Sequence, residues 1–210
     1  MKTTDDFNWD TYTANYYEPE MDNIISKDHS MLVSKSYIDA SGHGVFKDNL
    51  HPNWKEVYHQ VIKSEATSVL EVGCGPGQHL INLYKLNPNL ELFGFEYSQS
   101  QIDLGYKHFN LQDYPFKDNL KVKDFSLDVG EPTSRYDLVF TQAVTMHLAY
   151  SKASKFISNM GKLAKSRIVM IENVNSHNYD NLLKEALPAF QRVKDSKYVS
   201  TVFVMERIKY

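Results

Sequence analysis

Three glycines at alternate positions, Gly73, Gly75 and Gly77, follow a short apolar segment that contains Glu71 near its end. Glycine lets the backbone approach a ligand closely, because it has no Cβ atom. A strand that leads into such a loop and then into a helix places backbone N–H groups and the positive end of the helix beside that ligand. The segment therefore predicts a binding site for an anionic or zwitterionic molecule.

The glycine spacing disfavours a dinucleotide. A dinucleotide-binding loop carries glycine at its first, third and sixth positions, and the sixth position here is Gln78. The segment from Glu71 to Gly77 instead resembles the first motif of the class I S-adenosylmethionine-dependent methyltransferases, in which an acidic residue precedes Gly-x-Gly-x-Gly. This resemblance, rather than the spacing, implies S-adenosyl-L-methionine as the cofactor. A NAD-type oxidoreductase on a related fold and a non-catalytic, methyltransferase-like binding protein are the alternative hypotheses.

Strands and helices alternate along the chain after the glycine loop. Further strands are predicted at residues 90–98, 119–126, 136–144 and 166–174, helices at 99–110, 150–165 and 180–187, and a final hairpin at 190–194 and 199–208. This order predicts an α/β fold with a doubly wound, mainly parallel, seven-stranded sheet and a C-terminal antiparallel hairpin. The resemblance implies the same architecture over residues 65–210, about two thirds of the chain.

Residues 1–64 are predicted to form an arm that packs on this core within a single domain. The arm is rich in tyrosine and small polar residues, and Pro52 opens a helix that extends to Ser64. In small class I methyltransferases the N-terminal region commonly folds over the cofactor. The resemblance thus implies a helical lid, formed by the Tyr-rich stretch from Asp10 to Tyr17. A packing arm or a homodimer contact is the alternative interpretation.

The resemblance places cofactor contacts at the carboxyl ends of successive strands, where ligands bind in sheets of this type. Glu71 is expected to reach the amino group of the ligand, and Glu96, 19 residues after Gly77, to accept hydrogen bonds from both ribose hydroxyls. Asp124 is expected to bind the adenine amino group, with Asp128 as a competing candidate. The other expected cofactor contacts are Gly73, Cys74, Gly75, Gly77, Tyr97, Phe125, Thr141 and Gln142.

Histidines beyond two of the strands are candidates for acid–base chemistry. Methyl transfer from a sulfonium depends largely on alignment, but a hydroxyl acceptor gains from a base that removes its proton. His147 lies just past the fourth strand and His177 after the fifth, and Glu172 is expected to orient a base or to replace it. A structural or cofactor-shielding role for His147, and catalysis without a base, stay open.

Motifs that the sequence lacks disfavour several classes of methyl acceptor. The fourth predicted strand ends in Thr141-Gln142-Ala143-Val144, whereas enzymes that methylate amino groups of nucleic acid bases carry an Asp/Asn-Pro-Pro-aromatic tetrad at the end of this strand. Metal-dependent catechol-type enzymes carry an aspartate where this chain has Thr141, and no HxxxH or CxxC spacing occurs, so no metal is expected. By elimination, the expected reaction is O-methylation of a small metabolite or of a sugar or glycan precursor.

Composition limits the partners and the compartment. The net charge is −3, with acids and bases mixed, which gives no basic footprint for nucleic acid or for an anionic membrane. No stretch approaches the roughly 18 apolar residues of a membrane span, and the N-terminus lacks the order of a signal peptide. The single cysteine, Cys74, cannot form an internal disulfide, which suits a reducing compartment. We therefore expect a cytoplasmic protein without nucleic acid or membrane partners.

Overall fold

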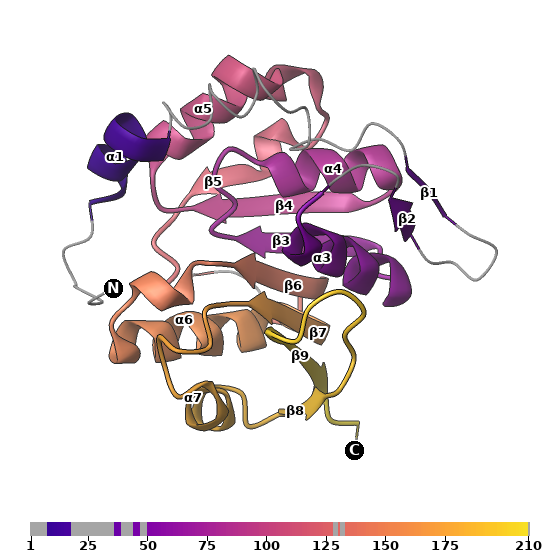
Figure 1. Ribbon diagram of the computed structural model, residues 1–210, viewed down its shortest axis with the longest axis vertical. Coiled ribbons are helices and arrows are strands. Elements are labelled where there is room, and N and C mark those ends of the chain that lie inside the picture. Colours follow the sequence, from indigo (N-terminus) through magenta and orange to yellow (C-terminus); the bar gives the residue numbers. More distant parts are fainter. Residues whose placement is uncertain are drawn as a thin grey trace.

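A seven-stranded sheet forms the centre of the computed structural model, which describes residues 8–17, 36–38, 44–46, 50–127, 130 and 133–209. The strand order is β5-β4-β3-β6-β7-β9-β8 (Figure 1). The strands are β3 (Ser68–Val72), β4 (Glu91–Glu96), β5 (Leu120–Val122), β6 (Tyr136–Gln142), β7 (Ala164–Ile171), β8 (Phe190–Val193) and β9 (Val202–Arg207). Strands β3 to β7 pair in parallel, and β9 runs antiparallel to β7 and β8. The predicted fold class is confirmed.

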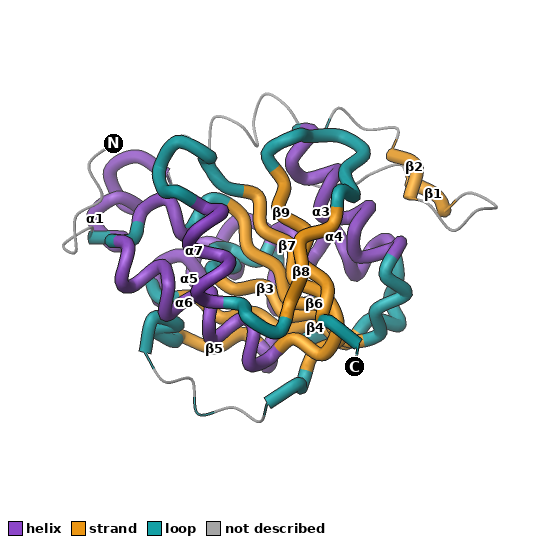
Figure 2. Tube along the Cα trace, turned by 90° about the horizontal axis from the view of Figure 1, so that it is seen from below, coloured by secondary structure: helices purple, strands orange, loops and turns teal. Residues whose placement is uncertain are grey.

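Helices cover both faces of this sheet. Figure 2 shows α3 and α4 on one side of the strands and α6 and α7 on the other. The helices are α3 (Pro52–Lys63), α4 (Gln78–Leu86), α5 (Gln99–Phe109), α6 (Tyr150–Leu163) and α7 (Tyr179–Ala186). Neighbouring apolar residues of a strand enter different cores, as Val69 packs with α3 and α4 while Leu70 packs with α6 and α7. A sheet covered on both faces requires such continuous apolar strands.

The N-terminal arm contains more structure than the sequence predicted. The stretch in which a lid helix was expected, Asp10 to Tyr17, contains most of helix α1 (Trp9–Tyr12) and the π-helical segment η1 (Thr13–Tyr17), and its role as a lid stays a prediction. Asn8 caps α1, because its side chain accepts a hydrogen bond from the backbone N–H of Thr11 at 2.9 Å. Two short strands, β1 (Ser36–Ile38) and β2 (Gly44–Phe46), form a separate antiparallel pair that was not predicted.

Strand β5 is shorter than the predicted segment 119–126, because the chain turns after Val122. The carboxylate of Asp124 accepts a hydrogen bond from the backbone N–H of Ser126 at 2.9 Å and another from its hydroxyl at 2.6 Å. An aspartate side chain that binds the N–H group two residues on stabilises a turn. Asp124 therefore ends this edge strand and remains at its carboxyl end.

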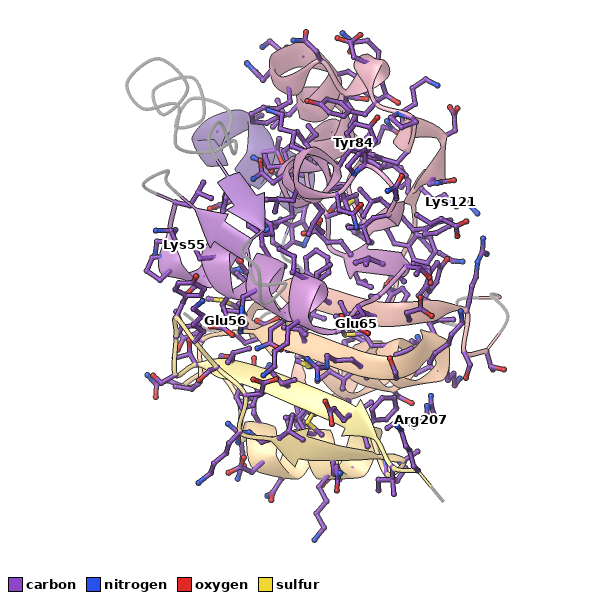
Figure 3. The ribbon with its side chains drawn as sticks, turned by 90° about the vertical axis from the view of Figure 1, so that its right-hand side faces the viewer. Lys55, Glu56, Glu65, Tyr84, Lys121 and Arg207 are labelled. Atoms are coloured by element: carbon purple, nitrogen blue, oxygen red, sulfur yellow. The ribbon has the colours of Figure 1, made fainter. Side chains whose placement is uncertain are left out.

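Strand β9 begins at Val202 instead of the predicted residue 199. The Glu56 carboxylate accepts hydrogen bonds from the backbone N–H groups of Lys197, Tyr198 and Val199 at 2.9, 2.6 and 3.4 Å. These N–H groups are therefore unavailable to the sheet. Glu56, labelled in Figure 3, lies where α3 meets the loop before β9. The buried carboxylate of Glu56 thus holds α3 against the loop that precedes β9 in the C-terminal hairpin.

Helix α5 packs directly against the glycine loop, and Gly105 allows this contact. A Cβ atom at Gly105 would lie 2.4 Å from the carbonyl oxygen of Pro76 and 3.0 Å from the side chain of Leu111. Atoms in a close-packed interior do not approach so closely, so a larger residue would push the helix away from the loop. Gly105 is thus part of the framework that shapes the loop, a role that its sequence context did not reveal.

The substitution Gly105→Ala tests this packing through the sign of its effect. Inside a helix, alanine in place of glycine normally stabilises by about 1 kcal/mol. Here we expect a loss of roughly 1–3 kcal/mol in the free energy of unfolding, because the added methyl group overpacks the contact with Pro76. Urea denaturation followed by circular dichroism measures this quantity. A variant more stable than the wild type would contradict the packing argument.

Candidate functional site

A cavity of about 370 Å³ lies at the carboxyl ends of β3, β4 and β6. The chain proceeds from β3 to one side of the sheet through β4 and β5, and to the other through β6 and β7. Doubly wound sheets bind their ligands at this switch point. Ten of the predicted site residues line the cavity: Glu71, Gly73, Cys74, Gly75, Glu96, Tyr97, Asp124, Phe125, Gln142 and His147. Four of them do not: Gly77, Thr141, Glu172 and His177.

The loop after β3 is held flat against the neighbouring strand ends. The backbone N–H groups of Gly73 and Cys74 donate to the carbonyl oxygen of Phe95 at 2.7 and 3.1 Å. Gly73 has a φ of +75°, and a Cβ atom there would lie 2.3 Å from Cγ2 of Val144. Both the left-handed backbone and the close side chain require glycine at this position. The loop therefore presents bare backbone to the cavity.

Two carboxyl groups from adjacent strands meet at the cavity. Glu71 is 2% exposed, and its Oε2 has no hydrogen-bond partner among the described residues. Glu96 accepts hydrogen bonds from the backbone N–H groups of Gly75 and Ser98 at 2.9 and 3.0 Å. Burial raises the pKa of both side chains, and the charge of Glu96 raises that of Glu71 further. Buried acids with unused acceptor capacity suit a ligand that brings positive charge or hydrogen-bond donors.

The turn after β5 supplies the next part of the wall. Asp124 lines the cavity, with its Oδ1 held by Ser126. Phe125 is buried, and its ring packs against those of Phe95 and Phe156 with centroids 5.8 and 5.2 Å apart. This end of the cavity therefore combines a carboxylate with aromatic surface. Asp128, the competing candidate, lies outside the described residues.

Helix α1 lies beside α5 (Figure 1), and polar side chains connect it to the start of that helix. Oδ1 of Asp10 accepts hydrogen bonds from the hydroxyls of Ser98 and Ser100 at 2.6 and 2.8 Å, and these bonds lower the pKa of Asp10. Gln101 Nε2 donates to the hydroxyl of Thr13 at 2.6 Å. The position of these contacts fits the expected lid.

Aromatic rings connect helix α1 to the turn after β6. Trp9 of α1 meets the ring of His147 edge to face, with centroids 5.3 Å apart. Tyr12 and Trp54 also line the cavity. Burial lowers the pKa of His147, which favours a neutral imidazole near pH 7. Of the three predicted catalytic residues, His147 alone lines the cavity.

His79 is a cavity residue that the sequence analysis missed. Its Nδ1 lies 2.9 Å from the hydroxyl of Tyr58, which accepts a hydrogen bond from Asn82 Nδ2 at 2.7 Å. Asn82, Tyr58 and His79 thus form a buried hydrogen-bonded chain between α3 and α4. Burial lowers the pKa of His79 to about 3. The cavity thus gains a neutral imidazole, whose only sequence signal was a histidine in the first turn after the glycine loop.

Two of the predicted cofactor contacts, Gly77 and Thr141, do not line the cavity. The hydroxyl of Thr141 donates to the carbonyl oxygen of Val72 at 2.8 Å, and the side chain is fully buried. Gly77 precedes the first turn of α4 with a φ of +82°, and its N–H donates to the carbonyl oxygen of Cys74 at 2.9 Å. Thr141 therefore ties β6 to β3, and Gly77 closes the loop. Gln142 does line the cavity, where its side chain interacts with His79.

Glu172 and His177 contact the turn between β6 and α6 instead of the cavity. Glu172 accepts hydrogen bonds from the backbone N–H groups of Val144, Thr145 and Met146 at 3.2, 3.1 and 3.2 Å. His177 Nε2 donates to the carbonyl oxygen of Thr145 at 2.9 Å. The structure therefore places both side chains behind the wall that carries this turn.

In the ranges that the structure describes, no group of three or more His, Cys, Asp or Glu side chains is placed to hold a metal ion. Within the same ranges, no helix combines the length and apolar composition needed to cross a membrane.

Residues 63–206 match the protein family described as "Methyltransferase domain". A protein of Rickettsia prowazekii (strain Madrid E), described as uncharacterized, is 25% identical over 127 residues, which cover 59% of this chain and 50% of that protein. The chain thus spans about half the length of this curated relative.

Solved methyltransferase structures share the fold. Magnesium protoporphyrin IX methyltransferase from Synechocystis PCC 6803, with bound S-adenosylmethionine, has a TM-score of 0.56 and 18% identity, over 72% of this chain and 76% of that one. Human N-acetylserotonin methyltransferase, also with S-adenosylmethionine, has a TM-score of 0.54 and 18% identity, over 74% of this chain and 51% of that one. At such identities the similarity is one of architecture, and function depends on the site.

The buried imidazole predicts a specific dependence of stability on pH. The pKa of His79 is about 3 in the folded protein and 6.5 for an ordinary histidine, so the unfolded chain binds the proton more tightly. The stability contributed by neutral His79 is therefore complete above pH 6.5 and is lost as the pH falls toward 3. Between about pH 7.5 and 5, wild type should lose roughly 2 kcal/mol more than His79→Gln. Urea denaturation at both pH values measures this, and equal losses would refute the burial argument.

Proposed function

This chain belongs to the methyltransferase family, and we propose that it transfers a methyl group from S-adenosyl-L-methionine to a hydroxyl oxygen of a small molecule. The observation that carries the cofactor assignment is the buried Glu71, whose Oε2 lacks a partner among the described residues beside the glycine loop. An ammonium group is the natural complement of such a carboxyl, because pairing compensates the cost of burial. The relatives solved with bound S-adenosylmethionine support the same cofactor.

The cavity offers a contact for each part of this cofactor. Glu71 would bind the amino group, and the backbone at Gly73 and Gly75 would accommodate the methionine portion. Glu96 would accept hydrogen bonds from the ribose hydroxyls, as carboxylates at this position of related sheets do. Asp124, with the aromatic surface next to it, would bind adenine. Gly77 and Thr141 are proposed to support the loop and the strand from behind, consistent with their hydrogen bonds.

The residues around the cavity would align the acceptor and receive its proton. S-adenosylmethionine, when bound, supplies a methyl group already activated by its sulfonium. The protein's main contributions are then alignment and exclusion of water, to which Trp9, Tyr12 and Trp54 are suited. We propose that His147 accepts the proton of the acceptor hydroxyl, since burial lowers its pKa and keeps it neutral. Glu172 and His177 are less suited to that role, because neither lines the cavity.

A small metabolite, or a sugar or glycan precursor, remains the proposed acceptor class. The aromatic rings on the lid and on α3 form a surface for a ring-shaped molecule. Relatives named for magnesium protoporphyrin IX and for N-acetylserotonin are consistent with small acceptors. The net charge of −3 gives no general attraction for a polyanion such as nucleic acid.

Binding of S-adenosylhomocysteine tests the cofactor assignment. We expect calorimetry to detect binding by the wild type and a loss of about tenfold or more in Glu96→Gln, because the ribose hydroxyls lose a charged acceptor. Glu91→Gln is the matched control, since Glu91 lies exposed at the other end of β4. Its affinity should equal that of the wild type. The assignment fails if the wild type does not bind, or if both variants bind alike.

The role of His147 is tested by methyl transfer to a panel of hydroxylated metabolites and sugars, with labelled S-adenosylmethionine. For an acceptor found in this way, His147→Asn should lower kcat by about 100-fold or more, the usual contribution of a positioned base. The affinity for S-adenosylhomocysteine should change far less. An unchanged kcat would leave His147 with a shielding role only and would contradict this proposal.

A further inference from the structure

We infer that Glu172 is a positioning residue for the cofactor: from outside the cavity, its carboxylate holds the turn Val144–His147 against the glycine loop and the lid, and its protonation state sets the cofactor affinity. This inference rests on the proposed function, because it concerns the same cavity.

Both carboxylate oxygens of Glu172 accept hydrogen bonds from backbone N–H groups. It is 4% exposed, and three consecutive backbone N–H groups, those of Val144, Thr145 and Met146, point at its two oxygens. An ionised carboxylate is all acceptor and satisfies this set. A protonated carboxyl is neutral and its O–H oxygen is a weaker acceptor, so it holds the three N–H groups less strongly. The turn is therefore held more firmly by the ionised form.

The segment after β7 also fixes the other polar groups of Thr145. His177 Nε2 donates to its carbonyl oxygen at 2.9 Å, and its hydroxyl lies 2.9 Å from that of Tyr179. The hydroxyl of Tyr179 in turn lies 3.1 Å from that of Ser176. The backbone N–H, carbonyl and hydroxyl of Thr145 thus all depend on the segment from Glu172 to Tyr179. Such a network positions the turn as one unit.

The turn touches both parts of the site that surround the cofactor. Val144 occupies the space in which a Cβ atom of Gly73 would lie, so it packs directly on the glycine loop. His147 meets the ring of Trp9 on the lid. The turn begins at Ala143, whose φ of +56° is unfavourable for a residue with a Cβ atom and requires support from its surroundings. Loss of that support at Glu172 would reach the loop and the lid together.

The ionisation of Glu172 falls in the physiological range. Burial raises its pKa to about 7, although the N–H donors of the turn oppose this rise. The titratable groups on the segments that contact Glu172 are Tyr179 on α7, whose pKa is raised to about 12 by burial and by Glu172, His177, which binds Thr145, and His147 at the end of the turn. Cofactor affinity should therefore increase as the pH rises through about 7.

Folding stability should change in the opposite direction. The pKa of Glu172 in the folded protein lies above the ordinary 4.5, so the unfolded chain releases its proton first. The stability that protonated Glu172 contributes is complete below pH 4.5 and is lost as the pH rises through about 7. If Glu172 were merely structural, the cofactor affinity and the folding stability would change with pH in the same direction. If it positions the turn when ionised, the cofactor affinity rises with pH while the folding stability falls.

The test compares the wild type with Glu172→Gln across this pH range. Trp9 and Trp54 are the two tryptophans of the sequence, and both line the cavity, so intrinsic fluorescence reports the binding of S-adenosylhomocysteine. Near pH 8.5 the variant should bind about fivefold or more weakly than the wild type, a coupling of ordinary size. Near pH 5.5, where Glu172 is protonated, the two affinities should converge.

Glu56→Gln is the matched control. Glu56 is likewise buried and also accepts hydrogen bonds from three consecutive backbone N–H groups, but it lies outside the cavity lining. This variant should lose stability, and its affinity relative to the wild type should be the same at each pH. The control separates the loss of a buried carboxylate from the loss of its effect on the turn.

The outcomes separate this inference from the proposed function. Absence of binding by the wild type at every pH overturns both. Binding with a Glu172→Gln to wild-type ratio that does not vary with pH overturns the inference alone. A second measurement needs no variant: the amide proton shifts of Val144, Thr145 and Met146 should titrate together in the wild type, with a midpoint near pH 7. Three shifts that stay constant through this range would overturn the inference even if Glu172→Gln does not fold.

Discussion

Close backbone packing around the glycine loop is the constraint on which the rest of the site depends. A Cβ atom on Gly73 would lie 2.3 Å from Cγ2 of Val144, and a Cβ atom on Gly105 would lie 2.4 Å from the carbonyl oxygen of Pro76. The loop is thereby fixed between the turn after β6 and helix α5. A loop that its neighbours hold in one shape lowers the ordering cost of binding. A movement of either neighbour must also move the loop.

The charges of the cavity follow from this rigid frame. Glu71 and Glu96 end adjacent parallel strands, so the sheet brings two acids together away from solvent. Each oxygen of Glu96 accepts a hydrogen bond from one backbone N–H group, whereas Oε2 of Glu71 lacks a partner in the described structure. A buried polar group left in this state lowers folding stability, and such groups are concentrated at functional sites. A cationic ligand would compensate that loss, which links the stability of the fold to its proposed cofactor.

Much of the fold was predictable, because the strands are apolar runs separated by turn residues, and the strand ends located Glu71, Glu96 and Asp124 at the cavity. The limits of β5 and β9 were not predictable, since side chains of Asp124 and of the distant Glu56 determine them. The same holds for the candidate bases. Sequence places His147 and His177 after neighbouring strands, but only tertiary packing shows which ring faces the cavity. The pair β1–β2 was missed because strands of three residues leave little periodic signal.

The most direct measurement is a crystal structure of the protein with S-adenosylhomocysteine. The proposed site predicts the ligand in the cavity at the switch point, with its amino group within hydrogen-bond distance of the Glu71 carboxyl and its ribose hydroxyls on Glu96. A ligand bound elsewhere, or one whose amino group points away from a still unpaired Glu71, would contradict the proposed role of this buried carboxyl.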